Sequence, residues 1–254
     1  MKTRTATSAD VPRIAAIILA AVAAEEPWRA YIPAAARQNG TYTAAVERLV
    51  KGYVEASENE WTVEVVETGK SDAQGNPIIA SVAIWDMRAA PPPARRGSSL
   101  VSNRSSQEVD AAKAAAKAPA WSDDWAIDPE NDRLQSLNNA FAQGKQQFFA
   151  GGGPQIVLRL LATAPNCQRN GYAKALCKSG LEIGWRRQAA VCLQTGVRGY
   201  IALSAMGFSE VGAVTIPAIP GQEEQVLKAL KMDVAKAQES HPSFMTSFWN
   251  YVRN

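Results

Sequence analysis

Histidine and cysteine are scarce in this chain of 254 residues, which contains one histidine and three cysteines. The single histidine, His241, excludes most catalytic triads and all histidine-rich metal sites. The cysteines Cys167, Cys177 and Cys192 have no metal-ligand spacing, and their odd number leaves one without a disulfide partner. Cys167 is not expected to act as a nucleophile, because no histidine is available to activate it. We therefore expect reduced thiols, no metal site and a cytoplasmic (intracellular) protein.

Long apolar runs and dense charge blocks are also missing. The best candidate for a membrane span, Ile14–Ala24, is far shorter than the ~20 apolar residues that a span needs. Its isoleucines repeat at helical spacing after Asp10 and Pro12, which predicts a core-facing helix capped by Ser8 or Asp10 rather than a secretion signal. The net charge of +3 includes no Lys/Arg block. The sequence thus predicts a soluble protein with neither a membrane nor a nucleic acid as partner.

The first ninety residues alternate between strand and helix patterns. Besides the helix just described, the expected elements are strand Thr3–Thr7, helix Thr43–Ala56, strand Trp61–Glu67 and strand Ile78–Trp85. A turn at Gln74–Pro77 separates the last two strands. We expect these two strands to form an antiparallel hairpin with a long connection.

Residues 89–153 differ in composition from the rest of the chain. Pro91–Pro93 and the Ser-rich stretch that follows contain few large apolar side chains, so this part is expected to bury little surface. Asp128–Pro129 is typical of a helix start. We interpret 89–153 as a partly helical insertion within one domain, and Trp121 and Trp125 indicate that part of it packs on the core.

After the insertion the pattern becomes regular again. The expected elements are strand Ile156–Thr163, helix Ala173–Arg187, strand Val191–Thr195, helix Arg198–Met206 and strand Val211–Ile216. The first three form a βαβ unit. Val226–Met232 fits a strand or a helix. The whole pattern predicts an α/β (α+β mixed) single domain over residues 1–254, in which 234–254 form a C-terminal tail with a helix at Ser243–Val252.

The turn Gln168–Ala173 carries the clearest functional signal. A tight turn between a strand and a helix leaves backbone N–H groups without helical partners, and the helix dipole attracts anions to the same place. Gly171 lets the backbone approach an anion closely. The turn therefore predicts a phosphate or pyrophosphate site, and a purely structural glycine is the alternative.

Three segments resemble the GCN5-related N-acetyltransferases, the GNAT superfamily. Leu160–Ala173 is similar to the family pattern of an apolar strand, a proline, two residues and then Gln/Arg-x-x-Gly-x-Gly/Ala. Gly199–Phe208 is similar to the late helix that ends in Gly-Phe, and Thr3–Val11 resembles the usual opening. The resemblance covers most of the chain outside 89–153 and the last twenty or so residues. The long insertion and Trp185 resemble fungal members most.

The resemblance implies the GNAT fold, a mostly antiparallel mixed sheet flanked by helices, here with a long helical insertion. It also implies acetyl-CoA as cosubstrate and no metal. Backbone N–H groups of the turn hold the pyrophosphate in this family, and Lys174 adds a charge-assisted contact. The pantetheine arm pairs with the edge of the preceding strand, by position at Leu161 and Thr163. The implied CoA-binding residues are Leu161, Ala162, Thr163, Gln168, Arg169, Asn170, Gly171, Tyr172, Ala173 and Lys174.

The catalytic residues depart from the family pattern. Many members have a tyrosine four residues before the glycine of Gly-Phe, where it protonates the leaving thiolate. This chain has Leu203 there, so Tyr200, about one helical turn earlier, is the expected substitute. Asp86 is the expected general base, and Glu64 is a second candidate. A water-mediated route without a dedicated acid is equally open.

The expected function is acetyl-CoA-dependent N-acetyl transfer to the amine of a small molecule or peptide by direct attack. The alternative is a non-catalytic acyl-CoA-binding module, which Leu203 favours. A general nucleotide-binding protein is disfavoured, because only one βαβ unit is visible. The acceptor is not identified by the sequence, although Trp28, Trp121 and Trp125 are candidates for lining an aromatic-amine pocket. The expected assembly is a monomer or a homodimer.

Overall fold

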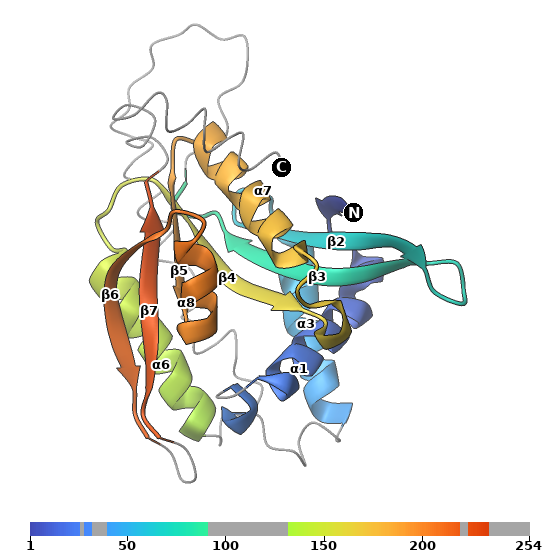
Figure 1. The fold of residues 1–254 in the computed structure, drawn as a ribbon, viewed down its shortest axis with the longest axis horizontal. Helices are drawn as coiled ribbons and strands as arrows, with labels where there is room; N and C mark the ends of the chain where they lie inside the picture. The colour runs from blue at the N-terminus through green and yellow to red at the C-terminus, as the bar shows by residue number, and fades with distance from the viewer. Residues whose placement is uncertain (26–27, 32–39, 91–131, 219–222, 234–254) are drawn as a thin grey trace, which may run out of the picture.

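A seven-stranded sheet forms the centre of the computed structural model, which describes residues 1–25, 28–31, 40–90, 132–218 and 223–233 (Figure 1). The strand order is β1-β2-β3-β4-β5-β7-β6. The strands are β1 (Lys2–Thr5), β2 (Trp61–Ser71), β3 (Pro77–Asp86), β4 (Gln155–Thr163), β5 (Ala190–Thr195), β6 (Ser209–Ile216) and β7 (Gln225–Met232). Among these described strands, only β4 and β5 pair in parallel. The predicted mostly antiparallel mixed sheet is confirmed.

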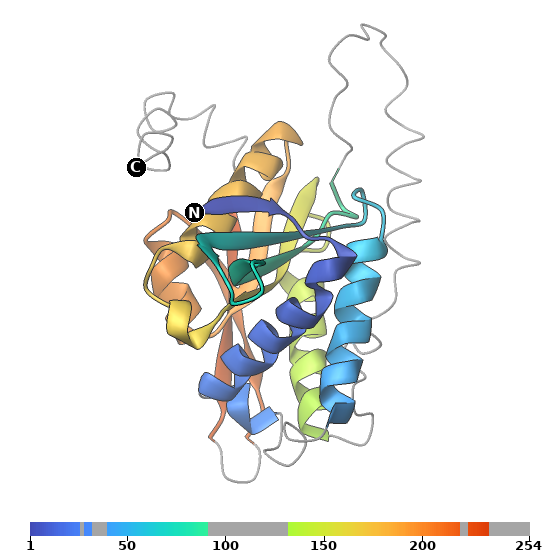
Figure 2. The same cartoon turned by 90° about the vertical axis from the view of Figure 1, so that its right-hand side faces the viewer.

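Helices cover both faces of this sheet (Figures 1 and 2). One face holds α1 (Val11–Ala24), α3 (Gly40–Glu55) and α6 (Asp132–Phe148), and the other holds α7 (Tyr172–Arg186) and α8 (Val197–Ser204). Three short 3-10 helices are η1 (Ser8–Asp10), η2 (Trp28–Tyr31) and η3 (Pro165–Cys167). Among the described residues no helix is both long enough and apolar enough to span a bilayer.

Strand β3 explains why the sheet needs a helical layer on each side. Most side chains along this strand are buried, and successive side chains point to opposite faces of the sheet. Ala83 and Trp85 belong to the core under α7, whereas Val82 and Ile84 belong to the core with α1 and α3. A strand with apolar residues on both faces can be stable only in the middle of such a sandwich.

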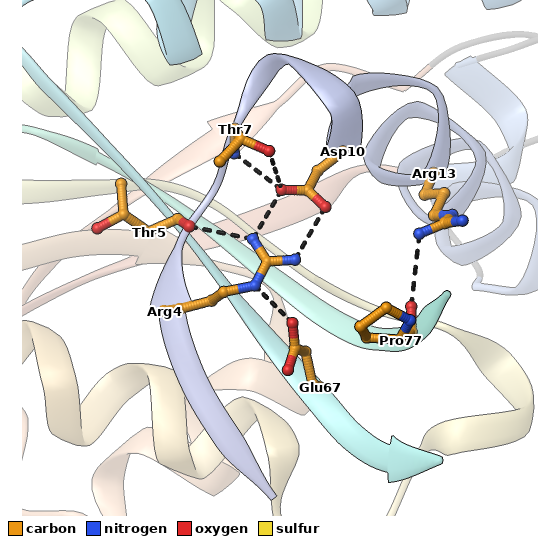
Figure 3. Close-up of polar contacts among 7 residues, drawn as sticks. All are labelled: Arg4, Thr5, Thr7, Asp10, Arg13, Glu67 and Pro77. Carbon is orange, nitrogen blue, oxygen red and sulfur yellow. Dashed lines mark hydrogen bonds and ion pairs between the residues drawn. The ribbon is translucent and has the colours of Figure 1, made fainter. Parts of the chain in front are cut away.

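An ion-pair cluster fixes the start of α1 to the sheet (Figure 3). Arg4 on β1 donates two hydrogen bonds to the Asp10 carboxylate, at 2.7 and 2.9 Å, and a third to Glu67 on β2. Thr7 and Asp10 form a capping box, in which the Thr7 N–H donates to Asp10 at 2.8 Å. Asp10, one of the two predicted caps, occupies the N-cap position of α1, but its side chain bonds back to Thr7 and makes no cap hydrogen bond to α1. The hydrogen bonds from Arg4 outweigh partial burial and lower the pKa of Asp10 to about 2.

Most predicted elements are confirmed, with one correction. The hairpin connection is short rather than long, because β2 continues to Ser71 and β3 begins at Pro77. The Asp72 carboxylate accepts the N–H groups of Gln74 and Asn76, which holds this loop in a tight turn. Val226–Met232, which fitted a strand or a helix, lies in strand β7.

Of the expected insertion 89–153, the structure describes residues 89–90 and 132–153, and the Pro- and Ser-rich stretch that was expected to bury little lies outside the described residues. Leu134 and Ala140 on α6 are buried against β6 and β7, and Phe149 is fully buried just after the helix. Trp121, Trp125 and the predicted helix Ser243–Val252 lie outside the described residues.

Candidate functional site

Strands β4 and β5 separate halfway along their length. They pair only from Gln155 and Ala190 to Leu158 and Leu193. Beyond that point β4 pairs with β3 alone and the end of β5 pairs with β7 alone, so the two strands diverge (Figure 1). The second half of β4 therefore has one edge that no described strand covers.

A β-bulge at Arg159 accompanies the separation. Ile84 on β3 faces Leu160 and Trp85 faces Leu158, so Arg159 is the extra residue. A bulge bends its strand and increases the local twist, which turns β4 away from β5. The Arg159 side chain is buried, with its guanidinium 5.5 Å from the centre of the Trp61 ring.

The register identifies which backbone groups point to the uncovered edge. The Ala164 N–H donates to Ala80 O at 2.9 Å, and the Ser81 hydroxyl donates to Ala162 O at 2.8 Å. Both contacts point toward β3, and backbone groups alternate in direction along a strand. Leu161 and Thr163 therefore direct their N–H and C=O groups to the opposite, uncovered edge.

The turn after β4 presents unpaired backbone N–H groups. The first helical bond of α7 runs from the Ala175 N–H to Gly171 O at 3.0 Å. Among the described residues, the N–H groups of Gly171, Tyr172 and Ala173 have no hydrogen-bond acceptor, and no side chain caps the helix. These donors lie at the positive end of a 15-residue helix, where anions bind favourably.

The glycine in this turn has a conformational role. Gly171 has a φ of 80°, in the left-handed region that other residues rarely adopt. A Cβ at this position would meet nothing within 4 Å. The backbone angle is therefore a sufficient reason for the glycine, alongside the predicted close approach of an anion. Arg169 also has a positive φ, of 62°. The side-chain amide of Asn170 stabilises the turn by donating hydrogen bonds to Cys167 O and Gln168 O.

One large cavity of about 1310 Å³ connects the turn with the gap between β4 and β5. Nine of the ten predicted CoA-binding residues line it, and the exception is Asn170. Single ligand pockets usually have volumes of roughly 300–1,000 Å³, so this cavity has room for a cofactor and a second substrate.

The two ends of the cavity differ in chemistry. The end at the turn is lined by the cations Arg169 and Lys174, which belong to the turn and to the start of α7. The far end, between α1, η2, α6 and β7, is mainly apolar and aromatic; its lining includes Ile18, Val22, Trp28, Tyr31, Leu134, Leu137, Phe141, Ile216 and Leu227. Glu25 is the one carboxylate in the lining among the described residues. A polyanion thus fits one end and an apolar group the other.

The two predicted catalytic side chains do not line this cavity. Tyr200 lies near Lys228 of β7, whose ammonium is 5.7 Å from the ring centre. Leu203 lines the cavity instead. These residues are three positions apart, about 60° around the helix, and both contact the same core cluster, but only Leu203 reaches the cavity lining. The role of Tyr200 stays a prediction that its placement does not favour.

Asp86 lies in a buried ion-pair cluster away from the cavity lining. Its carboxylate accepts hydrogen bonds from Arg88 at 2.8 and 2.9 Å and from Lys145 at 3.2 Å. Burial would raise its pKa, but the Arg88 hydrogen bonds and nearby positive charges prevail and lower the pKa to about 2. A carboxylate so strongly held in its charged form is a poor general base at neutral pH.

Glu64 and Cys177 also have structural surroundings. Glu64 is buried under α7 and accepts hydrogen bonds from the Ser179 hydroxyl at 2.6 Å and the Trp85 indole at 3.1 Å. Cys177 lines the cavity, but burial raises its pKa to about 12, so it remains a protonated thiol. Neither group is placed to attack a substrate.

The far end of the cavity was mostly missed by sequence reasoning, apart from Trp28. It is assembled from segments that are distant in the chain, and no local motif marks Glu25, Tyr31 or Phe141. Among the described residues no group of three or more His, Cys, Asp or Glu side chains is arranged to hold a metal ion.

Comparison with solved structures identifies the fold. The chain is similar to a putative arylalkylamine N-acetyltransferase 7 from the yellow fever mosquito Aedes aegypti, with a TM-score of 0.56 and 14% identity over 91% of this chain and 86% of that one. The predicted GNAT acetyltransferase fold is thus confirmed.

Two bacterial structures show weaker similarity. A histone acetyltransferase HPA2 and related acetyltransferase from Corynebacterium glutamicum has a TM-score of 0.48 and 19% identity, over 90% of this chain and 94% of that one. A putative acetyltransferase from Salmonella typhimurium, with its cofactor acetyl-CoA, has a TM-score of 0.45 and 11% identity, over 92% and 94%. No protein-family model and no curated protein sequence matches the chain. The resemblance to fungal members in particular stays a prediction.

Proposed function

We propose that this protein is an acetyl-CoA-dependent N-acetyltransferase of the GNAT superfamily. The observation that carries the proposal is the single cavity joining the uncovered β4 edge to the unpaired N–H groups at the start of α7. CoA has a matching layout, with a pantetheine arm that can form strand-like hydrogen bonds and a pyrophosphate that needs N–H donors. Leu161 and Thr163 would bind the first, and the turn Gln168–Ala173 with Lys174 would bind the second.

The proposed chemistry is direct transfer. The nitrogen lone pair of a neutral amine attacks the acetyl carbonyl carbon, the C–S bond breaks, the nitrogen loses a proton and the CoA thiolate gains one. An N–H on the uncovered β4 edge would stabilise the negative charge that develops on the carbonyl oxygen. We infer that water carries both protons, since Leu203 cannot donate one and neither Tyr200 nor Asp86 lines the cavity.

A non-catalytic acyl-CoA-binding module is the second candidate, and Leu203 at the usual tyrosine position is the observation that favours it. Calorimetry with acetyl-CoA tests both candidates, since absence of binding would exclude them together. Release of free thiol from acetyl-CoA in the presence of amines then distinguishes them. An enzyme releases thiol only when an acceptor is present, whereas a binding module releases none.

The cellular setting belongs to the same proposal. We infer an intracellular protein, because Cys167, Cys177 and Cys192 are all free thiols in the structure. A monomer or a homodimer remains our expectation, and the molar mass of the purified protein, measured by light scattering, would identify the assembly.

A further inference from the structure

We propose that the acceptor is a primary amine carrying an aromatic ring, whose ammonium group is attracted to Glu25 and whose ring packs against Trp28, Tyr31 and Phe141. This inference rests on the proposed acetyltransferase function and specifies its second substrate. It follows from the chemistry at the end of the cavity that faces away from the turn.

Three aromatic side chains form a connected wall at that end. Trp28 and Phe141 stack with ring centres 6.4 Å apart and an angle of 22° between their planes. Tyr31 adjoins Trp28, with centres 6.3 Å apart. The rings come from η2 and α6, and aliphatic side chains of α1, β6 and β7 extend the apolar surface. Such a surface suits a flat apolar group, because aromatic pairs interact favourably beyond their buried area.

Glu25 supplies negative charge at the same end. It is half-buried, and its carboxylate has no hydrogen bond or ion pair with another described residue. It also occupies the C-cap position of the 14-residue helix α1, where the helix dipole adds partial negative charge. An ammonium group would therefore be attracted to this position, which holds the amine in the cavity before it loses its proton.

The balance of charges disfavours other classes of amine. Four cations line the cavity, Arg159, Arg169, Lys174 and Arg198, against one described carboxylate. A polyamine would leave most of its charges without a partner and would be repelled by these cations. A peptide backbone would need polar partners, whereas Asn138 and Gln194 are the main polar side chains described near the aromatic wall. An acceptor with one positive charge and one apolar group therefore fits the cavity best.

Equilibrium binding tests the inference without requiring turnover. Calorimetry on the full chain, with and without saturating CoA, would compare tryptamine and phenethylamine with ethylamine, spermidine and a short peptide with a free amino terminus. We expect the two aromatic amines to bind at least ~10-fold more tightly than the other three, since one aromatic ring commonly changes affinity by that factor.

Matched variants assign the contacts. Trp28→Ala should weaken tryptamine binding about 10-fold or more, whereas Trp185→Ala, outside the cavity, should leave it unchanged. Glu25→Gln should weaken binding of tryptamine about 10-fold but leave the neutral analogue 3-ethylindole unaffected, and Glu60→Gln serves as the charge control. All four variants should bind acetyl-CoA like the wild type.

The outcomes separate this inference from the function on which it rests. Tighter binding of spermidine or the peptide, no binding of any amine, or equal effects of Glu25→Gln on tryptamine and 3-ethylindole would overturn the acceptor assignment alone. Tight tryptamine binding with no acetyl-CoA binding would overturn the acetyltransferase proposal and leave the amine site standing.

Discussion

Glu64 is a buried carboxylate whose charge costs stability. Burial raises its pKa, although the hydrogen bonds from Ser179 and Trp85 partly oppose this. The folded protein thus keeps a proton that the unfolded chain has released over the interval above the ordinary glutamate pKa. Stability contributed by this group therefore falls as the pH rises through that interval.

Glu64→Gln should remove this pH dependence. The amide can still accept from Trp85, and its N–H can donate to the Ser179 hydroxyl. We expect the free energy of unfolding of the variant, relative to the wild type, to increase as the pH rises through the interval above the ordinary glutamate pKa of about 4.3. Urea unfolding across that range measures the difference, with exposed Glu60→Gln as the control. A difference that stays constant with pH would contradict the assignment.

Tyr200 provides a second test at a single residue. Its ring lies near Lys228 rather than in the cavity, so Tyr200→Phe should retain kcat within about threefold. General acids typically contribute roughly 100- to 10,000-fold. Thiol release with acetyl-CoA and the best acceptor amine gives kcat. A loss of about 100-fold, together with an altered pH profile, would instead identify Tyr200 as the acid expected from the sequence.

The contact between α7 and β3 determines how the helix of the phosphate turn sits on the sheet. Gly180 on α7 packs directly on the Trp85 ring, and any Cβ at Gly180 would overlap that ring. Trp85 is fully buried and its indole N–H is bonded to Glu64, so it has little freedom to move. The small residue at this position therefore allows the close approach of helix and strand.

Gly180→Ala is expected to destabilise the protein by about 1–3 kcal/mol, the usual cost of overpacking a core. Gly52 on α3 offers a control in which the same substitution should increase stability, since a Cβ there would meet nothing within 4 Å. Gly52→Ala should stabilise by about 0.5–1 kcal/mol through helix propensity alone. Thermal unfolding of both variants measures the two effects. Similar stabilisation by both would show that the helix is not in direct contact with Trp85.

Local patterns predicted the donor half of the molecule better than the acceptor half. The turn Gln168–Ala173 and the strand before it are contiguous in sequence, and the structure places nearly all of them on one cavity. The pantetheine-binding edge of β4 was implied only by the family resemblance, since nothing in the hydrophobic pattern of β4 or β5 specifies where their pairing stops. The bulge at Arg159 that accompanies it was not predicted.

The acceptor half depends on how distant segments meet. Glu25 follows α1, Phe141 lies on α6 within the expected insertion, and Leu227 lies on a strand that the sequence could not distinguish from a helix. A helix after Asp128–Pro129 was predicted, but nothing in its sequence indicated that α6 would form a wall of the site. Which side chain of α8 reaches the cavity also needed the fold, since Leu203 lines it and Tyr200 does not.

Acetyl-CoA should stabilise the whole molecule by bridging the turn and the β4 edge. A ligand at 100 times its Kd stabilises the folded state by about 2.7 kcal/mol. For a protein of this size the Tm should therefore rise by about 5–10 °C.

Acetyl-pantetheine, which lacks the pyrophosphate, and ATP, which lacks the pantetheine arm, should each give a smaller Tm shift at equal concentration, because each occupies only one half of the donor site. Added salt should reduce the shift with acetyl-CoA and with ATP but not with acetyl-pantetheine, since only the phosphates face Arg169 and Lys174. A shift with ATP equal to that with acetyl-CoA would mean that the turn is a general phosphate site and that the β4 edge does not bind the ligand.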